Sequence, residues 1–106
     1  MIERARDIMR SRTQETIQYP LESVSDALLF GFSYMESRDH IVEYVIASPE
    51  MIKRIFAEIP DSKVNPSEEA LGSVWTAKLL ISDRLTKNQL LLSNCTYSAV
   101  VKVDNR

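Results

Sequence analysis

The residues best suited to catalysis are few in this chain and lie far apart. His40 is the only histidine and Cys95 the only cysteine among 106 residues. Asp39 and Glu43 lie near His40 and could assist a general base, but a histidine where a polar turn meets a strand favours a surface or strand-entry role. No base can be paired with Cys95 to activate its thiol. We therefore interpret Cys95 as a small buried or half-buried residue.

Metal and phosphate sites also lack a sequence pattern. A structural zinc site needs four cysteine or histidine ligands, and the chain has two such residues. Gly31 and Gly72 stand alone, so there is no glycine-rich phosphate loop. Glu68 and Glu69 are adjacent and would point in different directions on a helix, which favours solvating or helix-start charges. We expect no catalytic residue, no metal and no cofactor, and hence a protein that is not an enzyme.

Arginines surround a short apolar pattern at the start of the sequence. Residues 1–18 predict an amphipathic helix whose apolar face comprises Ile2, Ala5, Ile8 and Met9. The first interpretation is a helix that packs on the domain or on a second subunit through this face. The alternative is a nucleic-acid contact, because arginine suits phosphate, made by Arg4, Arg6, Arg10 and Arg12. Trp75, the only tryptophan, is interpreted as a core or interface anchor.

The clearest structural signal is a strand that passes directly into a helix. Residues 41–47 are apolar and β-branched, as in a buried strand, and helical spacing of apolar residues follows over 49–59. Ser48 and Pro49 suit the cap and first position of that helix. An earlier helix is predicted to begin near residues 21–23, although alternating aromatics leave a strand over 28–35 open as a competitor.

The last part of the chain predicts a loop and three strands. Residues 61–70 are polar and loop-like, whereas 73–82, 89–93 and 98–103 read as strands. We expect one α+β or α/β domain over residues 1–106, with an N-terminal helix over 1–18 and a core over 21–103. Its predicted sheet is mixed, has three or four strands, and packs with about three helices.

Composition indicates an ordinary soluble domain. Hydrophobic residues make up 44% and charged residues 26% of the chain, and the formal charge of −2 gives no general attraction for nucleic acid or an anionic membrane. One cysteine excludes an internal disulfide. No apolar stretch approaches a membrane span, and the first residues are too charged for a secretion signal. We expect a cytoplasmic protein with no membrane association.

Residues 41–94 resemble the axial domain of tailed-phage major capsid proteins and encapsulins. The resemblance lies in an apolar strand that ends in Ser48-Pro49, a helix, a loop, a strand led by Gly72, a polar turn and a leucine-rich strand over 88–92. It covers about half of the chain. The family also has an extended arm, a long peripheral helix and a projecting loop, which 106 residues cannot all hold. The resemblance therefore implies a small stand-alone relative rather than a shell-forming subunit.

The leading hypothesis is a non-enzymatic structural or protein-interaction domain that self-associates, as a homo-oligomer or with a protein partner. It depends on the missing catalytic chemistry, the amphipathic first segment and the capsid-like order of elements. The alternative is a small nucleic-acid-binding or regulatory protein that uses the N-terminal arginines, whose binding would fall steeply with salt.

Overall fold

The computed structural model describes residues 13–19, 23–67, 70–94 and 97–103. Within these ranges it contains two helices, α2 (Val24–Ser37) and α3 (Pro49–Glu58). The strands of the same ranges are β1 (Thr13–Tyr19), β2 (Tyr44–Ala47), β3 (Ser62–Val64), β4 (Gly72–Val74), β5 (Ala77–Ile81), β6 (Gln89–Ser93) and β7 (Tyr97–Val103). The radius of gyration is 12.2 Å, close to the roughly 13 Å expected for one domain of about 100 residues.

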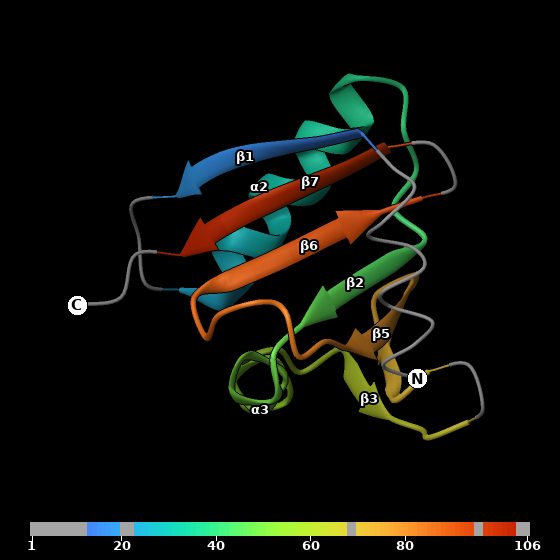
Figure 1. Ribbon diagram of the computed structural model, residues 1–106. Coiled ribbons are helices and arrows are strands. Elements are labelled where there is room, and N and C mark those ends of the chain that lie inside the picture. The colour runs from blue at the N-terminus through green and yellow to red at the C-terminus, as the bar shows by residue number, and fades with distance from the viewer. Residues whose placement is uncertain (1–12, 20–22, 68–69, 95–96, 104–106) are drawn as a thin grey trace.

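One mixed sheet joins all these strands in the order β1-β7-β6-β2-β5-β4-β3 (Figure 1). The pairs β1–β7 and β2–β5 are parallel, and the other neighbours are antiparallel. The prediction of three or four strands with about three helices is therefore wrong: the described chain has more sheet than helix. The mixed character of the sheet is confirmed, and β2 and β5 are parallel neighbours.

The predicted N-terminal helix over 1–18 is wrong over residues 13–18, because residues 13–19 form β1 and run parallel to β7 over seven paired positions, and its first twelve residues lie outside the described residues. Thr13, Thr16, Ile17 and Tyr19 are good strand formers, and a ready edge on β7 offers every residue of the segment a backbone partner. Tertiary pairing therefore outweighs a weak helical pattern here.

Two further predictions change: a strand over 73–82 and a loop over 61–70. The predicted strand over 73–82 is a hairpin, in which Val74 pairs with Ala77 across a two-residue turn. Trp75 occupies that turn with a φ of 52°, a conformation that favours glycine. The segment 61–70, expected to be a loop, contains the short strand β3, which pairs with β4.

Helix α2 is confirmed, and the competing strand over 28–35 is excluded. Ser23 caps it: its Oγ accepts a hydrogen bond from the Asp26 N–H at 3.2 Å. Gly31 faces the sheet, and a Cβ there would come within 2.9 Å of a Leu92 methyl carbon. The glycine thus lets α2 approach β6 closely.

Helix α3 forms as the sequence predicts. Buried Ser48 accepts a hydrogen bond from the Met51 N–H at 3.2 Å, and Pro49 occupies the first turn. At the other end, the Ser62 hydroxyl donates to the Ile59 carbonyl oxygen at 2.6 Å. The two helices meet where the Val24 N–H donates to the Glu58 carboxylate at 3.4 Å.

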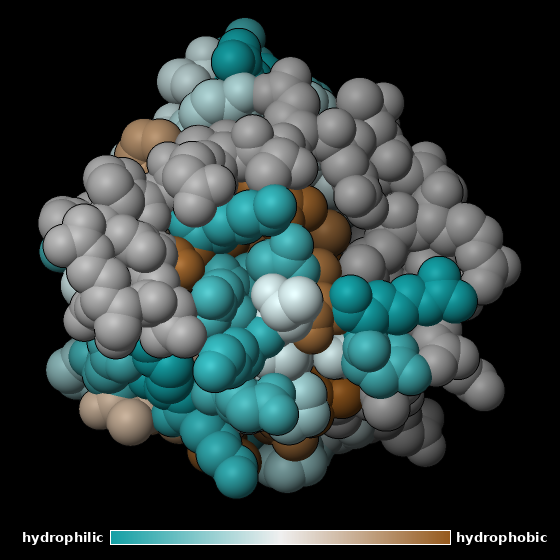
Figure 2. Space-filling view, turned by 60° about the vertical axis from the view of Figure 1, so that its left-hand side comes forward, coloured by the Kyte–Doolittle hydropathy of each residue, from teal (hydrophilic) through white to brown (hydrophobic). Residues whose placement is uncertain are grey.

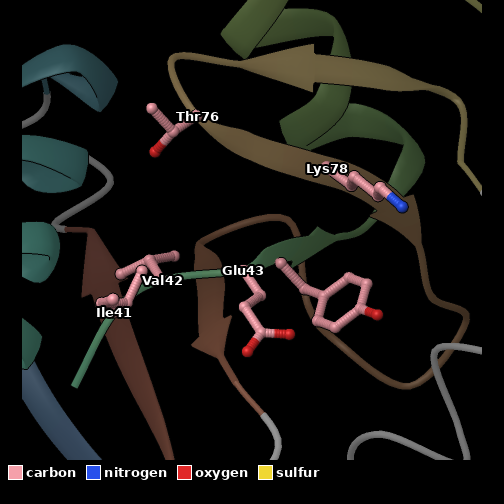
Figure 3. A pocket seen from close by; sticks show the side chains of 6 residues that line it. Ile41, Val42, Glu43, Thr76 and Lys78 are labelled. Atoms are coloured by element: carbon pink, nitrogen blue, oxygen red, sulfur yellow. The ribbon is translucent and has the colours of Figure 1, made fainter.

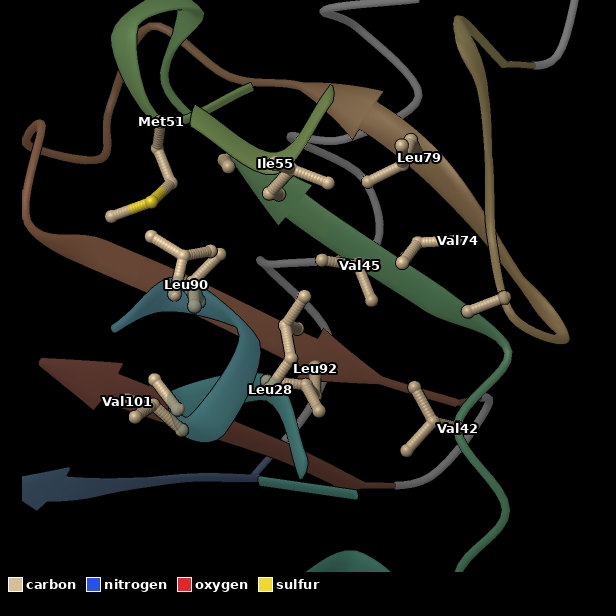
Figure 4. Close-up of a cluster of buried hydrophobic side chains, with 14 of the residues drawn as sticks. Leu28, Val42, Val45, Met51, Ile55, Val74, Leu79, Leu90, Leu92 and Val101 are labelled. Carbon is tan, nitrogen blue, oxygen red and sulfur yellow. The ribbon is translucent and has the colours of Figure 1, made fainter. Parts of the chain in front are cut away.

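Both helices cover the same face of the sheet, and most of the core lies between them and the strands. Figure 4 shows Leu28 of α2 and Ile55 of α3 directed toward Val45, Leu90 and other strand residues of this cluster. Alternate strand residues point to the other face, as the pleat requires. There a smaller buried cluster comprises Ile46, Ala70, Leu80, Leu91 and Val100.

Candidate interaction surface

The outer face of α2 is the most apolar exposed helix surface in the described chain. Leu29 is 53% exposed and Phe30 37% exposed, although both belong to a helix whose inner face is fully buried. Large side chains left in water give up the roughly 1.5–3 kcal/mol that burial of each would provide. Such a surface on a folded domain is typical of an interaction site when the exposed side chains are contiguous.

Phe30, Tyr34 and Arg38 form a chain of contacts along one side of α2, where Tyr34 is half-buried and packs against the larger hydrophobic cluster. The Phe30 and Tyr34 ring centroids are 6.5 Å apart, and the Arg38 guanidinium carbon lies 4.4 Å from the Tyr34 ring centroid. Arg38 follows the last residue of α2 as its C-cap, so its side chain folds back along the helix. Asp26, which is exposed in the first turn, completes a row in which each member follows the last by four residues.

The sequence contains a signal for this surface, but the alternation of aromatic residues concealed it. Phe30, Phe32 and Tyr34 alternate as they would in a strand. In a helix, residues two apart point to nearly opposite sides. Phe32 accordingly turns inward and meets the Trp75 ring edge to face, with centroids 5.0 Å apart and planes at 81°. The spacing of four that links Asp26 to Arg38 is the pattern that would have identified the outer row.

Trp75 is the one predicted interaction residue within the described ranges. It is half-buried at the β4–β5 turn and packs on Phe32 and the larger hydrophobic cluster. These contacts agree with the interpretation of Trp75 as a core anchor. Its role as an interface anchor stays a prediction. The other predicted residues lie outside the described residues: Ile2, Ala5, Ile8 and Met9 of the apolar face, and Arg4, Arg6, Arg10 and Arg12 of the nucleic-acid alternative.

His40 belongs to a polar cluster that joins the end of α2 to the β6–β7 turn. Its ring stacks on Tyr97, with centroids 4.5 Å apart and planes at 5°. The Asn94 side-chain nitrogen lies 3.3 Å from His40 Nδ1 and donates to the Ile41 carbonyl oxygen at 3.0 Å. Asn94 Oδ1 accepts from the Tyr97 N–H at 2.9 Å. The amide nitrogen can only donate, so Nδ1 accepts, and these contacts give His40 a structural role.

A cavity of about 260 Å³ lies where the chain enters β2. Figure 3 shows it bounded by Ile41, Val42 and Glu43 on one side and by Thr76 and Lys78 of the β4–β5 hairpin on the other. The Glu43 carboxylate and the Lys78 ammonium point in different directions, so they do not converge on one ligand.

A smaller hollow of about 170 Å³ lies beside the β3–β4 connection and β5, and its lining comprises Asn65, Ser67, Ala70, Gly72, Ser73 and Lys78. Within the described ranges, no group of three or more His, Cys, Asp or Glu side chains is placed to hold a metal ion.

Neither α2 nor α3 is long and apolar enough to cross a membrane. In the view of Figure 2, hydrophilic side chains cover most of the described surface, with hydrophobic ones visible between them.

Comparisons with protein-family models, with curated proteins and with solved structures find no match to this chain.

Proposed function

We propose that this chain is a non-enzymatic structural or protein-interaction domain that self-associates in the cytoplasm. The observation that carries the proposal is the exposure of Leu29 and Phe30 on α2. Helix α2 is held against the sheet by its buried inner face and by Gly31, which packs against β6. The proposed cytoplasmic location is supported by the single cysteine, which excludes an internal disulfide.

The order of elements supports a relation to the axial domain of tailed-phage capsid proteins and encapsulins. An apolar strand (β2) ends just before Ser48, α3 follows, Gly72 leads the β4–β5 hairpin, and a polar turn precedes the leucine-rich β6. In the sheet, β2 lies between β5 and β6. The sequence segments that carry the resemblance are therefore packed side by side, as parts of one structural unit would be.

Sedimentation velocity of the purified chain over a wide concentration range tests the proposal. We expect the average mass to rise above that of one chain as the concentration increases. The rise should be gradual, since a small exposed apolar surface supports only a weak interface. A single species of monomer mass at every concentration, together with no partner recovered in an affinity pull-down, would contradict the proposal.

A further inference from the structure

One asparagine side chain ties the α2–β2 connection, residues 38–43, to the β6–β7 turn. Asn94 Oδ1 accepts from the Tyr97 N–H at 2.9 Å, and Asn94 Nδ2 donates to the Ile41 carbonyl oxygen at 3.0 Å. Both partners are main-chain groups whose donor or acceptor character is fixed, so turning the amide over would lose both hydrogen bonds. Asn94 is 5% exposed, which leaves little access for water to replace them. The backbone therefore sets the direction of this amide.

The fixed amide decides which form of His40 fits beside it. Asn94 Nδ2 lies 3.3 Å from His40 Nδ1 and presents a hydrogen to it. A neutral imidazole with its proton on Nε2 accepts that hydrogen at Nδ1, whereas a charged imidazolium carries a proton on both nitrogens. The charged ring would place one N–H group against another. Turning the ring over would keep its stack on Tyr97 but bring a carbon-bound hydrogen to the amide, so the charged form loses the hydrogen bond in either orientation.

We propose that His40 is a proton-sensitive latch: the neutral ring holds the α2–β2 connection on the β6–β7 turn, and uptake of a proton loosens it. Histidine is the side chain that ordinarily changes charge between about pH 5 and 8. The connection carries Ile41, which is 75% exposed, and together with Val42 and Glu43 it forms one side of the larger cavity. Acidification therefore loosens one wall of that cavity. The latch is independent of the proposed self-association.

Other charged and aromatic groups near His40 act on the same proton. Arg38 and Asp39 precede it and Glu43 follows it, and all three are exposed, so water and salt screen their effect on the ring. Within the described ranges, His40 forms no ion pair with a carboxylate. Tyr97 is the titratable residue across the stack, and the face of its ring attracts a cation, which opposes release. The expected effect is therefore the local loss of one hydrogen bond, with the rest of the fold retained.

Amide hydrogen exchange at about pH 7.5 and about pH 5.5 tests the latch where it acts. Two N–H groups report on it: that of Glu43, which donates to the Ser93 carbonyl oxygen at 2.9 Å, and that of Tyr97, which donates to Asn94. After correction for the intrinsic pH dependence of exchange, we expect their protection to fall about fivefold at the lower pH, as for the loss of one hydrogen bond. The Ile52 N–H, bonded in the first turn of α3, is the internal reference and should keep its protection. The unfolded chain takes up the proton without breaking a hydrogen bond, so stability falls as the pH falls.

Two substitutions at position 40 separate the hydrogen bond from the ring stack. His40→Gln keeps an acceptor for Asn94 that does not titrate, so the Tyr97 N–H should keep its protection at both pH values. His40→Phe keeps an aromatic ring on Tyr97 but offers no acceptor. Its protection should be about fivefold lower than that of the unmodified chain at about pH 7.5 and equal to it at about pH 5.5. Because the chain has no other histidine, neither variant should retain a pH effect in this range.

The outcomes either support the latch or overturn it. A loss of protection on acidification that is confined to the two reporters, and that both variants abolish, supports it. Unchanged protection in the unmodified chain overturns it, because the fold then accommodates the charged ring. An equal loss at the Ile52 N–H, or the same pH effect in His40→Gln, also overturns it, because acid then acts elsewhere in the chain. If circular dichroism shows that His40→Phe is unfolded, His40→Gln decides alone, since it retains the acceptor.

Discussion

Helices α2 and α3 cover the same face of one sheet, but they differ in what they present to solvent. The exposed positions of α3 include charged Glu50, Lys53 and Glu58, and α3 exposes no large hydrophobic side chain. Helix α2 buries an apolar face of the same kind and also exposes Leu29 and Phe30. The two helices therefore differ in the large apolar side chains that they leave exposed, and the proposed function starts from this difference.

The largest effect should come from the inner faces, where the two helices are alike. Leu28→Ala in α2 and Ile55→Ala in α3 should each lower the free energy of unfolding by about 3 kcal/mol in urea denaturation, because each side chain is fully buried and leaves a cavity. Leu29→Ala, one position along α2, should change it by less than about 0.5 kcal/mol. Equal losses at positions 28 and 29 would show that the outer face of α2 belongs to the core.

Gly31 and Gly72 both lie close to other atoms of the chain, but only the neighbours of Gly31 are side-chain atoms that can move. A Cβ at Gly72 would overlap the Lys63 carbonyl oxygen, so Gly72→Ala must displace β3 from β4 and should lose about 2 kcal/mol of unfolding free energy. At Gly31 the nearest atoms are methyl carbons of Leu92 and Val101, which can move, and alanine favours the helix by about 1 kcal/mol. Gly31→Ala should therefore lie within about 1 kcal/mol of the unmodified chain. A greater loss at position 31 than at position 72 would contradict this reading.

The caps test whether α2 is held as firmly as α3. Ser48→Ala should cost about 1.5 kcal/mol, because Ser48 is buried and the Met51 N–H would lose its partner away from water. Ser23→Ala should cost about 0.7 kcal/mol, because Ser23 is half-buried and water can replace its oxygen. Thermal unfolding of the two variants gives the order, and a reversed order would mean that exposure does not decide the strength of these caps.

The smallest effect is expected just beyond the end of α2. Asp39 has a φ of 61° and occupies the position where helices often end in glycine, with the His40 N–H donating to the Met35 carbonyl oxygen. Asp39→Gly removes the strain of a left-handed backbone but adds freedom to the unfolded chain, so the gain should be about 0.5 kcal/mol. Calorimetry should show a slightly higher melting temperature, and Asp39→Ala, which keeps the strain, should show no increase.

The local signals in the sequence located most elements but not the size of the sheet. Ser23 and Ser48 mark the starts of both helices, and residues 89–93 and 98–103 are strands as expected. The β4–β5 hairpin was missed because Trp75 takes a turn conformation that normally signals glycine. Strand β1 was missed because its partner, β7, lies more than 75 residues later in the chain, a pairing that periodicity within a window cannot reveal.

The candidate surface was predicted less well than the fold. The residues proposed at the N-terminus lie outside the described residues, and Trp75 lies against Phe32. The row on α2 was concealed because its aromatic residues alternate as in a strand. Their spacing of four residues becomes informative only when the strand alternative for 28–35 is excluded.

The sequence by itself determined where helices begin, which residues are apolar enough for a core, and that a single histidine and a single cysteine limit the chemistry that the chain can do. Those properties depend on neighbours a few residues apart. Only the tertiary structure decided that β1 joins β7, that the chain reverses at Trp75, and which face of α2 the sheet covers. These outcomes depend on partners far along the chain, whose pairing and packing energies exceed the local preferences of the segments that they recruit.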